Sequence, residues 1–195
     1  WHWHWQFYLR YCCYLPMDSS KPMQGRAVVP IFSRYNNEDC MGCVARSIYE
    51  QCKACKYYHP PNMCGSKYVW SKWKNSTNLK TEKTFYNWSN AYEKIKQKKK
   101  VYLVEGQGDV WRLWESGYEN VLGLFSDKLT DSQLFLLESL FIDEIYICMD
   151  NDNKGREASL RIRDKVKGNF NGKIFTPIKK DWGDCTINEV RRCLT

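Results

Sequence analysis

Five carboxylates stand where short hydrophobic runs of the sequence end. Glu105 directly follows one run, Asp150 and Asp152 follow a second, and Asp181 and Asp184 follow a third. Any one of them alone would be an ordinary solvated side chain at the end of a strand. If the runs are parallel strands of one sheet, their ends meet at one edge, where cations must offset the gathered charge. Mg²⁺ prefers carboxylate oxygens and keeps waters for substrate phosphates, so the set predicts a magnesium site.

A second group of residues has the spacing of metal ligands. Cys52, Cys55, His59 and Cys64 follow the pattern C-x2-C-x3-H-x4-C within "CKACKYYHPPNMC". Three thiolates and one imidazole on a short loop can wrap one tetrahedral Zn²⁺ and leave no open position. We therefore expect a structural zinc that stabilises a loop too small to have its own core. The alternative is four reduced side chains in a surface loop.

Composition and hydropathy indicate a folded chain without a membrane segment. Hydrophobic residues make up 43% of the 195 residues, which excludes a disordered protein. The sequence contains no apolar run near the roughly 20 residues that a membrane helix needs. The N-terminal stretch "WHWHWQFYLRYCCYLP" lacks the cationic and aliphatic regions of a signal peptide. We expect an intracellular, cytoplasmic protein.

The net charge of +8 is concentrated in the first half of the chain. Residues 1–100 hold 17 Lys/Arg and 6 Asp/Glu, whereas residues 101–195 hold 13 and 16. This asymmetry favours a protein that grips a polyanion with one part and binds cations with the other. The alternative is a protein with uneven surface charge and no such partner.

The elements that position these residues divide near residue 100, which predicts two domains, 1–100 and 101–195. In the first, residues 26–32 and 41–49 are typical of two strands of a hairpin, and residues 85–96 have the apolar spacing of a helix. This half is predicted to be a smaller α+β domain carrying the Cys/His loop.

The second half alternates regularly between strands and helices. Strands are expected at residues 101–104, 120–125, 144–150 and 172–178, with helices at 109–116, 130–140 and 155–166. This alternation predicts an α/β fold with a parallel sheet and helices on both faces.

Glu105 with Asp150-x-Asp152 resembles the signature of the TOPRIM (topoisomerase–primase) domain. In that family a Glu follows the first strand and an Asp-x-Asp follows a later one. TOPRIM domains occur in primases, topoisomerases, some nucleases and recombination mediators, so this resemblance leaves the reaction open.

The first half of the chain narrows the choice among these reactions, because it resembles the catalytic core of bacterial and phage DNA primases. Those enzymes have an Arg-x-x-x-Pro-Ile strand, a Gly-rich strand ending in Arg, and a Lys-Tyr-Leu-Asn-Ser segment, as in "RAVVPIF", "GCVARS" and "SKWKNST" here. Later elements follow in order to about residue 190. Gln107 departs from the usual Tyr of these enzymes, and Trp182, which lies between Asp181 and Asp184, departs from the usual Pro. The matching positions include Arg26, Pro30, Ile31, Gly42, Arg46, Lys72, Asn75, Ser76, Glu105, Gly106 and Asp109.

The resemblance implies a nucleotidyltransferase that makes short primers on single-stranded DNA from NTPs, in the cytoplasm of a bacterial or phage-infected cell. It implies that Mg²⁺ or Mn²⁺ is bound at the acidic edge, and that a replicative helicase is a partner in a separate chain. The residues implied to hold metal are Glu105, Asp150, Asp152 and Asp181, with Asp184 beside them. Those implied to contact template or nucleotide are Arg26, Arg46, Lys72, Asn75 and Asp109.

Two other functions fit the same residues. A TOPRIM nuclease would use the same acidic edge to cut a phosphodiester bond without NTPs. A non-catalytic accessory protein would bind single-stranded nucleic acid and incorporate no nucleotide.

Overall fold

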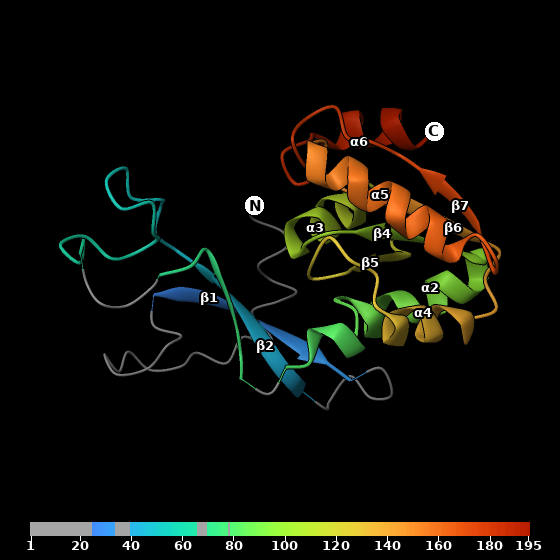
Figure 1. Cartoon of the computed structure of the whole chain (residues 1–195), viewed down its shortest axis with the longest axis horizontal. Coiled ribbons are helices and arrows are strands. Elements are labelled where there is room, and N and C mark those ends of the chain that lie inside the picture. Colours follow the sequence, from blue (N-terminus) through green and yellow to red (C-terminus); the bar gives the residue numbers. More distant parts are fainter. Residues whose placement is uncertain (1–24, 34–39, 66–69, 78) are drawn as a thin grey trace. The chain divides into compact units, whose positions relative to one another are not determined.

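The computed structural model describes residues 25–33, 40–65, 70–77 and 79–195 (Figure 1). The chain divides into two compact units, Trp1–Leu79 and Lys80–Thr195. This division lies before the boundary expected near residue 100. The reason is that helix α2 (Trp88–Lys98) packs on the sheet of the second unit through its buried side chains.

The first unit contains an antiparallel sheet in the order β1-β2-β3. Its strands are β1 (Arg26–Phe32), β2 (Cys40–Ser47) and β3 (Trp73–Asn75). Val29 of β1 lies opposite Val44 of β2, and both side chains are buried. The two strands pair as the sequence predicted, whereas most of the predicted turn between them lies outside the described residues.

The short strand β3 was not predicted, because its three residues owe their conformation to pairing with β2. Beyond its end, the N–H of Ser76 donates to the Cys43 carbonyl at 2.8 Å, and its Oγ accepts from the Cys43 N–H at 3.0 Å. A Cβ on Gly42 would lie 2.6 Å from that Oγ. Glycine at position 42 therefore allows the close approach of Ser76 to β2.

The second unit contains a parallel sheet in the order β5-β4-β6-β7 (Figure 1). The strands are β4 (Lys100–Val104), β5 (Val121–Gly123), β6 (Glu144–Cys148) and β7 (Asn171–Ile174). Helices connect successive strands, as crossovers between parallel strands require. The predicted parallel α/β fold is confirmed.

Helices cover both faces of the parallel sheet. Helix α2, helix α4 (Asp131–Glu138) and helix α5 (Asn153–Val166) bury apolar side chains with Val101 and Ile145 in one core. The strand residues that alternate with these, such as Cys148, face helix α3 (Gln107–Glu115) and helix α6 (Ile187–Leu194). A short 3-10 helix, η1 (Thr81–Lys83), precedes α2. No helix in the described part of the chain is both long and apolar enough to cross a membrane.

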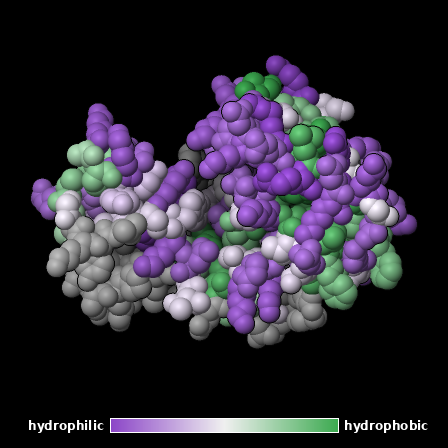
Figure 2. Space-filling model, in the orientation of Figure 1, coloured by the Kyte–Doolittle hydropathy of each residue, from purple (hydrophilic) through white to green (hydrophobic). Residues whose placement is uncertain are grey.

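Helix α5 illustrates why these segments are helical. Its buried residues, Gly155, Ala158, Ser159, Ile162 and Val166, recur at the three- and four-residue spacing of one helix face. The opposite face carries charged side chains, and Figure 2 shows mainly hydrophilic residues over this helix. The helix therefore presents an apolar stripe to the sheet and a charged face to solvent.

Candidate active site

The candidate active site lies at the carboxyl ends of β4 and β6. These strands are neighbours in the sheet, and Val104, the last residue of β4, is paired with Cys148, the last residue of β6. Glu105 comes directly after β4, and Asp150 comes two residues after Cys148. The pairing therefore brings these two predicted carboxylates to the same edge, with Asp152 following at the start of α5.

Glu105 is partly buried among other acids. Burial, followed by the charges of Asp150, Asp127 and Asp152, raises the pKa of Glu105 to about 7. Lys154 opposes this shift. A carboxylate with a raised pKa among like charges is stabilised when a cation binds beside it. The electrostatics of this edge therefore fit a divalent cation.

The start of α5 holds Asp152 and Asp150 in fixed positions. Asp152 is the N-cap of the helix, and its Oδ1 accepts a hydrogen bond from the Gly155 N–H at 2.8 Å. A Cβ on Gly155 would lie 2.0 Å from the backbone oxygen of Asp150. Only glycine permits this approach, which explains why a Gly follows the two aspartates at this spacing.

Asp109 is buried in the first turn of α3, and its carboxylate accepts hydrogen bonds from two backbone amides. Its Oδ2 accepts from the Gly106 N–H at 3.0 Å, and its Oδ1 accepts from the Gly183 N–H at 3.1 Å. Burial, followed by the charge of Asp150, raises the pKa of Asp109 to about 7. The resemblance implied that Asp109 contacts nucleotide. In the structure its oxygens hold the turn after Glu105 and the loop after β7.

That loop carries Asp181 and Asp184. Between them, Trp182 is completely buried, and its Nε1 donates to the carbonyl of Cys148 at 2.8 Å. Asp181 Oδ1 accepts from the Asp184 N–H at 2.8 Å, and the charge of Asp181 acts on Asp109. Asp181 thus lies in a loop anchored to the end of β6, while Asp184 is exposed.

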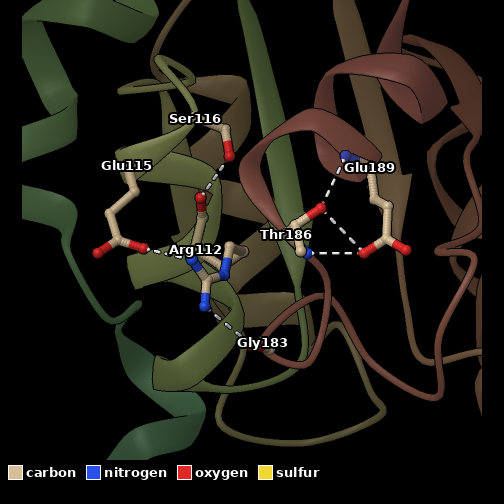
Figure 3. Close-up of polar contacts among 6 residues, drawn as sticks. All are labelled: Arg112, Glu115, Ser116, Gly183, Thr186 and Glu189. Atoms are coloured by element: carbon tan, nitrogen blue, oxygen red, sulfur yellow. Dashed lines mark hydrogen bonds and ion pairs between the residues drawn. The ribbon is translucent and has the colours of Figure 1, made fainter. Parts of the chain in front are cut away.

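Two further contacts fix the same loop (Figure 3). Arg112 of α3 pairs with Glu115 at 2.8 Å and donates to the Gly183 carbonyl at 3.5 Å. After the loop, Thr186 and Glu189 form a capping box that begins α6. The capping residues were present in the sequence, although α6 was not predicted from them.

In the first unit, Arg26 is used mainly within the fold. Its guanidinium donates to the carbonyls of Ser71 at 2.8 Å, Ala45 at 3.2 Å and Lys72 at 3.4 Å. Burial lowers the pKa of Arg26 from its ordinary value. Arg26 therefore joins β1 to the segment that leads into β3.

The other predicted polyanion-binding residues are exposed. Arg46 lies with its Cζ 5.5 Å from the centre of the Trp73 ring, a cation–π contact that leaves it at the surface. Lys72 and Asn75 are exposed on either side of Trp73. The structure thus places three of the predicted basic or polar residues around β3.

The four predicted cysteine and histidine ligands come together in the first unit. One ligand atom from each of Cys52, Cys55, His59 and Cys64 lies within 4.8 Å of all the others. The loop is joined to the sheet through Tyr58, whose carbonyl accepts from Ser47 Oγ at 3.1 Å. These distances match the donor set of one tetrahedral metal ion.

Protonation in this cluster also fits a metal. The His59 Nδ1 lies 2.7 Å from the Pro60 carbonyl, and its Nε2 is buried without a hydrogen-bond partner among the described residues. With the proton on Nδ1, the Nε2 lone pair is available to a cation. Hydrogen bonds from the Cys55 and Ala54 backbone lower the pKa of Cys52 to about 6, whereas those with Cys55 and Cys52 raise the pKa of Cys64 to about 11. The sulfurs cannot all be thiolates unless a cation offsets their charge.

One acidic residue of the edge was missed by the sequence analysis. Asp127 follows β5, the neighbour of β4 on its other side, and its charge raises the pKa of Glu105. It also pairs with Arg161 of α5 at 3.1 Å. The rule that located Glu105, a carboxylate after a hydrophobic run, applies equally to "NVLGLFSD" and could have found it.

Comparison with known proteins agrees with this geometry. Residues 99–174 match the Toprim domain family. The DNA primase of Enterococcus faecalis is 33% identical over 86 residues, which is 44% of this chain and 14% of that protein. The DNA primase of Aquifex aeolicus is 41% identical over 68 residues, which is 35% of this chain and 14% of that protein. The chain therefore matches only a small part of these relatives' lengths.

Solved structures extend the likeness to the first unit. The zinc-binding and RNA polymerase domains of Aquifex aeolicus primase match 92% of this chain and 43% of that chain, with a TM-score of 0.65 and 25% identity. The RNA polymerase domain of Mycobacterium tuberculosis primase DnaG matches 89% of this chain and 55% of that chain, with a TM-score of 0.66 and 17% identity, which shows the fold. Residues 99–174 thus match the Toprim domain family, and the chain is similar to the TOPRIM-domain DNA primases of the bacterial type.

Proposed function

We propose that this chain is the catalytic core of a DNA primase, which makes short primers on single-stranded DNA from NTPs. The observation that carries the proposal is the acidic edge. Glu105 and Asp150 follow paired neighbouring strands, and Asp152 follows on α5. Burial, followed by the charges of the neighbouring acids, raises the pKa of Glu105 to about 7. Such an edge favours two things that nucleotidyl transfer needs, divalent cations and the phosphates that they carry.

The proposed metal ligands are Glu105, Asp150 and Asp152, with Asp181 nearby. When bound there, Mg²⁺ or Mn²⁺ would neutralise the triphosphate and the leaving pyrophosphate. Asp109 and Trp182 keep the turn after Glu105 and the loop of Asp181 in place. The chemistry needs no nucleophile from the protein, because the primer 3′-hydroxyl attacks the nucleotide.

The first unit is proposed to bind the template strand. Arg46, Lys72 and Asn75 are exposed polar or basic residues around β3, where they can contact phosphates without reading sequence. A related DnaG catalytic domain has been solved bound to single-stranded DNA. The excess of basic residues in this half supports the same ligand. A replicative helicase in a separate chain is a further proposed partner.

We assign a structural Zn²⁺ to Cys52, Cys55, His59 and Cys64. The support is their common distance of 4.8 Å or less and the buried Nε2 of His59. A zinc bound by four protein ligands has no open position for substrate. Its proposed role is to order the loop between β2 and β3.

Primer synthesis on single-stranded DNA with NTPs and Mg²⁺ or Mn²⁺ tests the proposal. Glu105→Gln and Asp150→Asn preserve side-chain size but remove charge, so each is expected to lower synthesis by at least about 100-fold. Glu93→Gln, an exposed position on α2, is the matched control and should retain activity.

Three results would contradict the proposed active site or the primase assignment. Full activity in both acidic-edge variants would show that Glu105 and Asp150 are not part of the active site. Metal-dependent nicking of DNA without NTPs, and without primer synthesis, would identify a TOPRIM nuclease. Binding of single-stranded DNA without incorporation of any nucleotide by the wild type, even with helicase present, would identify an accessory protein.

A further inference from the structure

Phe125 adopts a backbone conformation that bulky residues rarely take. It comes two residues after the end of β5 and has a φ of 64°. Left-handed φ values favour glycine, because a Cβ crowds the following carbonyl. A phenylalanine held there by its surroundings is a candidate for a functional role.

The residues around Phe125 belong to the acidic edge. The Leu124 N–H donates to the carbonyl of Val104 at 2.9 Å, so the chain leaves β5 directly beside Glu105. Two residues after Phe125, Asp127 adds its charge to that of the acids around Glu105. Phe125 is thus an aromatic side chain at the edge where the triphosphate is proposed to bind.

A rigid support holds the Phe125 ring. Its ring lies edge to face with Tyr86, with centroids 6.3 Å apart. Tyr86 exchanges two backbone hydrogen bonds with Gly123, at 2.9 and 3.2 Å, and its hydroxyl accepts from Trp111 Nε1 at 2.7 Å. Tyr86 is buried, whereas Phe125 remains partly exposed. The exposed aromatic surface is therefore backed by a side chain that is itself fixed.

We propose that Phe125 is a base-stacking residue, which packs against the nucleobase of an incoming NTP or of the template strand. This inference rests on the proposed function and adds to it a residue that binds the base, next to the carboxylates that bind the phosphates. Every nucleobase has a π face, so a phenylalanine can bind all four without selecting among them.

Binding measurements with two probes test this role. The first is ATP in the presence of Mn²⁺, measured by calorimetry, and the second is a fluorescent oligothymidylate, measured by anisotropy. Phe125→Leu keeps an apolar side chain but removes the π face, so it should weaken binding of at least one probe by about fivefold or more. Phe125→Trp keeps a π face and should bind both probes as tightly as the wild type does. The probe that is affected identifies whether the base belongs to the nucleotide or to the template.

Phe141 offers a matched control. It is also a phenylalanine at positive φ, 52°, but it is 87% exposed and lies in the segment between α4 and β6. Phe141→Leu should leave binding of both probes unchanged. Phe125→Gly should unfold at a higher temperature than Phe125→Leu while binding equally weakly, since glycine tolerates this φ.

Two outcomes would separate this inference from the proposed function. If the wild type binds both probes and Phe125→Leu binds them equally well, Phe125 does not stack on a base, although the primase assignment stands. If the wild type binds neither probe, the proposed function fails and this role fails with it. Loss of binding in Phe141→Leu as well would show a general effect of the substitution and would also overturn the role.

Discussion

The carboxylate of Asp109 accepts a hydrogen bond from the backbone N–H of Gly183 at 3.1 Å, across 74 residues of sequence. Its other oxygen accepts from the N–H of Gly106, directly after Glu105. One buried side chain therefore joins the turn that follows β4 to the loop that carries Asp181. The positions of the acidic residues relative to one another depend on this residue.

Asp109→Asn should destabilise the protein, because an amide group cannot accept at both positions. One backbone N–H would face the NH₂ of the new side chain, which leaves a buried donor unsatisfied. We expect a loss of about 1–3 kcal/mol in the free energy of unfolding, measured in urea at pH 5, where both oxygens of the protonated carboxyl can still accept. Asp164→Asn, an exposed position on α5, should change it by less than about 0.5 kcal/mol. Equal stability of the two variants would mean that Asp109 holds neither segment.

The raised pKa of Asp109 predicts how stability depends on pH. Its pKa is about 7 in the folded chain because of burial and the charge of Asp150, and near 4 when unfolded. The folded state therefore favours the protonated form. The contribution of Asp109 to stability is complete below about pH 4 and is lost as pH rises to about 7. In EDTA, the free energy of unfolding should fall from pH 5 to pH 8, and less steeply in Asp109→Asn. The same slope in both proteins would refute this.

Gly155→Ala should disturb the acidic edge through the backbone. The new Cβ would lie 2.0 Å from the Asp150 oxygen and 2.7 Å from its carbonyl carbon, so the start of α5 must move. We expect a destabilisation of about 1–3 kcal/mol and weaker Mn²⁺ binding, measured by urea unfolding and calorimetry. Gly168→Ala, where a Cβ meets no atom within 4 Å, is the matched control. Unchanged Mn²⁺ binding in Gly155→Ala would show that the position of Asp150 does not matter for the metal.

The parts of the fold that could be predicted are those fixed by local pattern. Hydrophobic runs separated by helical segments indicated a parallel sheet, and parallel strands bring their carboxyl ends to one edge. Glu105 and Asp150 could therefore be placed together from the sequence alone. Cys52 and Cys64 could be grouped because their ligand spacing lies within one short loop.

The parts that were missed depend on partners distant in sequence. Strand β3 forms because it pairs with β2, where Trp73 lies opposite Arg46. Nothing in its three residues alone indicates a strand. The anchoring role of Asp109 depends on Gly183, and the burial of Trp182 depends on the Cys148 carbonyl. Trp182 stands where the related primases usually have Pro, and no local pattern indicates that a tryptophan would be completely buried there.

Removal of the proposed zinc should affect the first unit alone. Elemental analysis should detect one zinc per chain in the wild type, and Cys55→Ser is expected to abolish it, because serine is a poor zinc ligand. Cys40→Ser, which replaces an exposed thiol of the same unit outside the cluster, should retain the metal. Hydrogen exchange should become faster in the loop around Tyr58, whose N–H donates to the Trp70 carbonyl at 2.8 Å, and should be unchanged in β4 and β6. Full zinc content in Cys55→Ser, or equal loss in Cys40→Ser, would show that the metal is bound elsewhere.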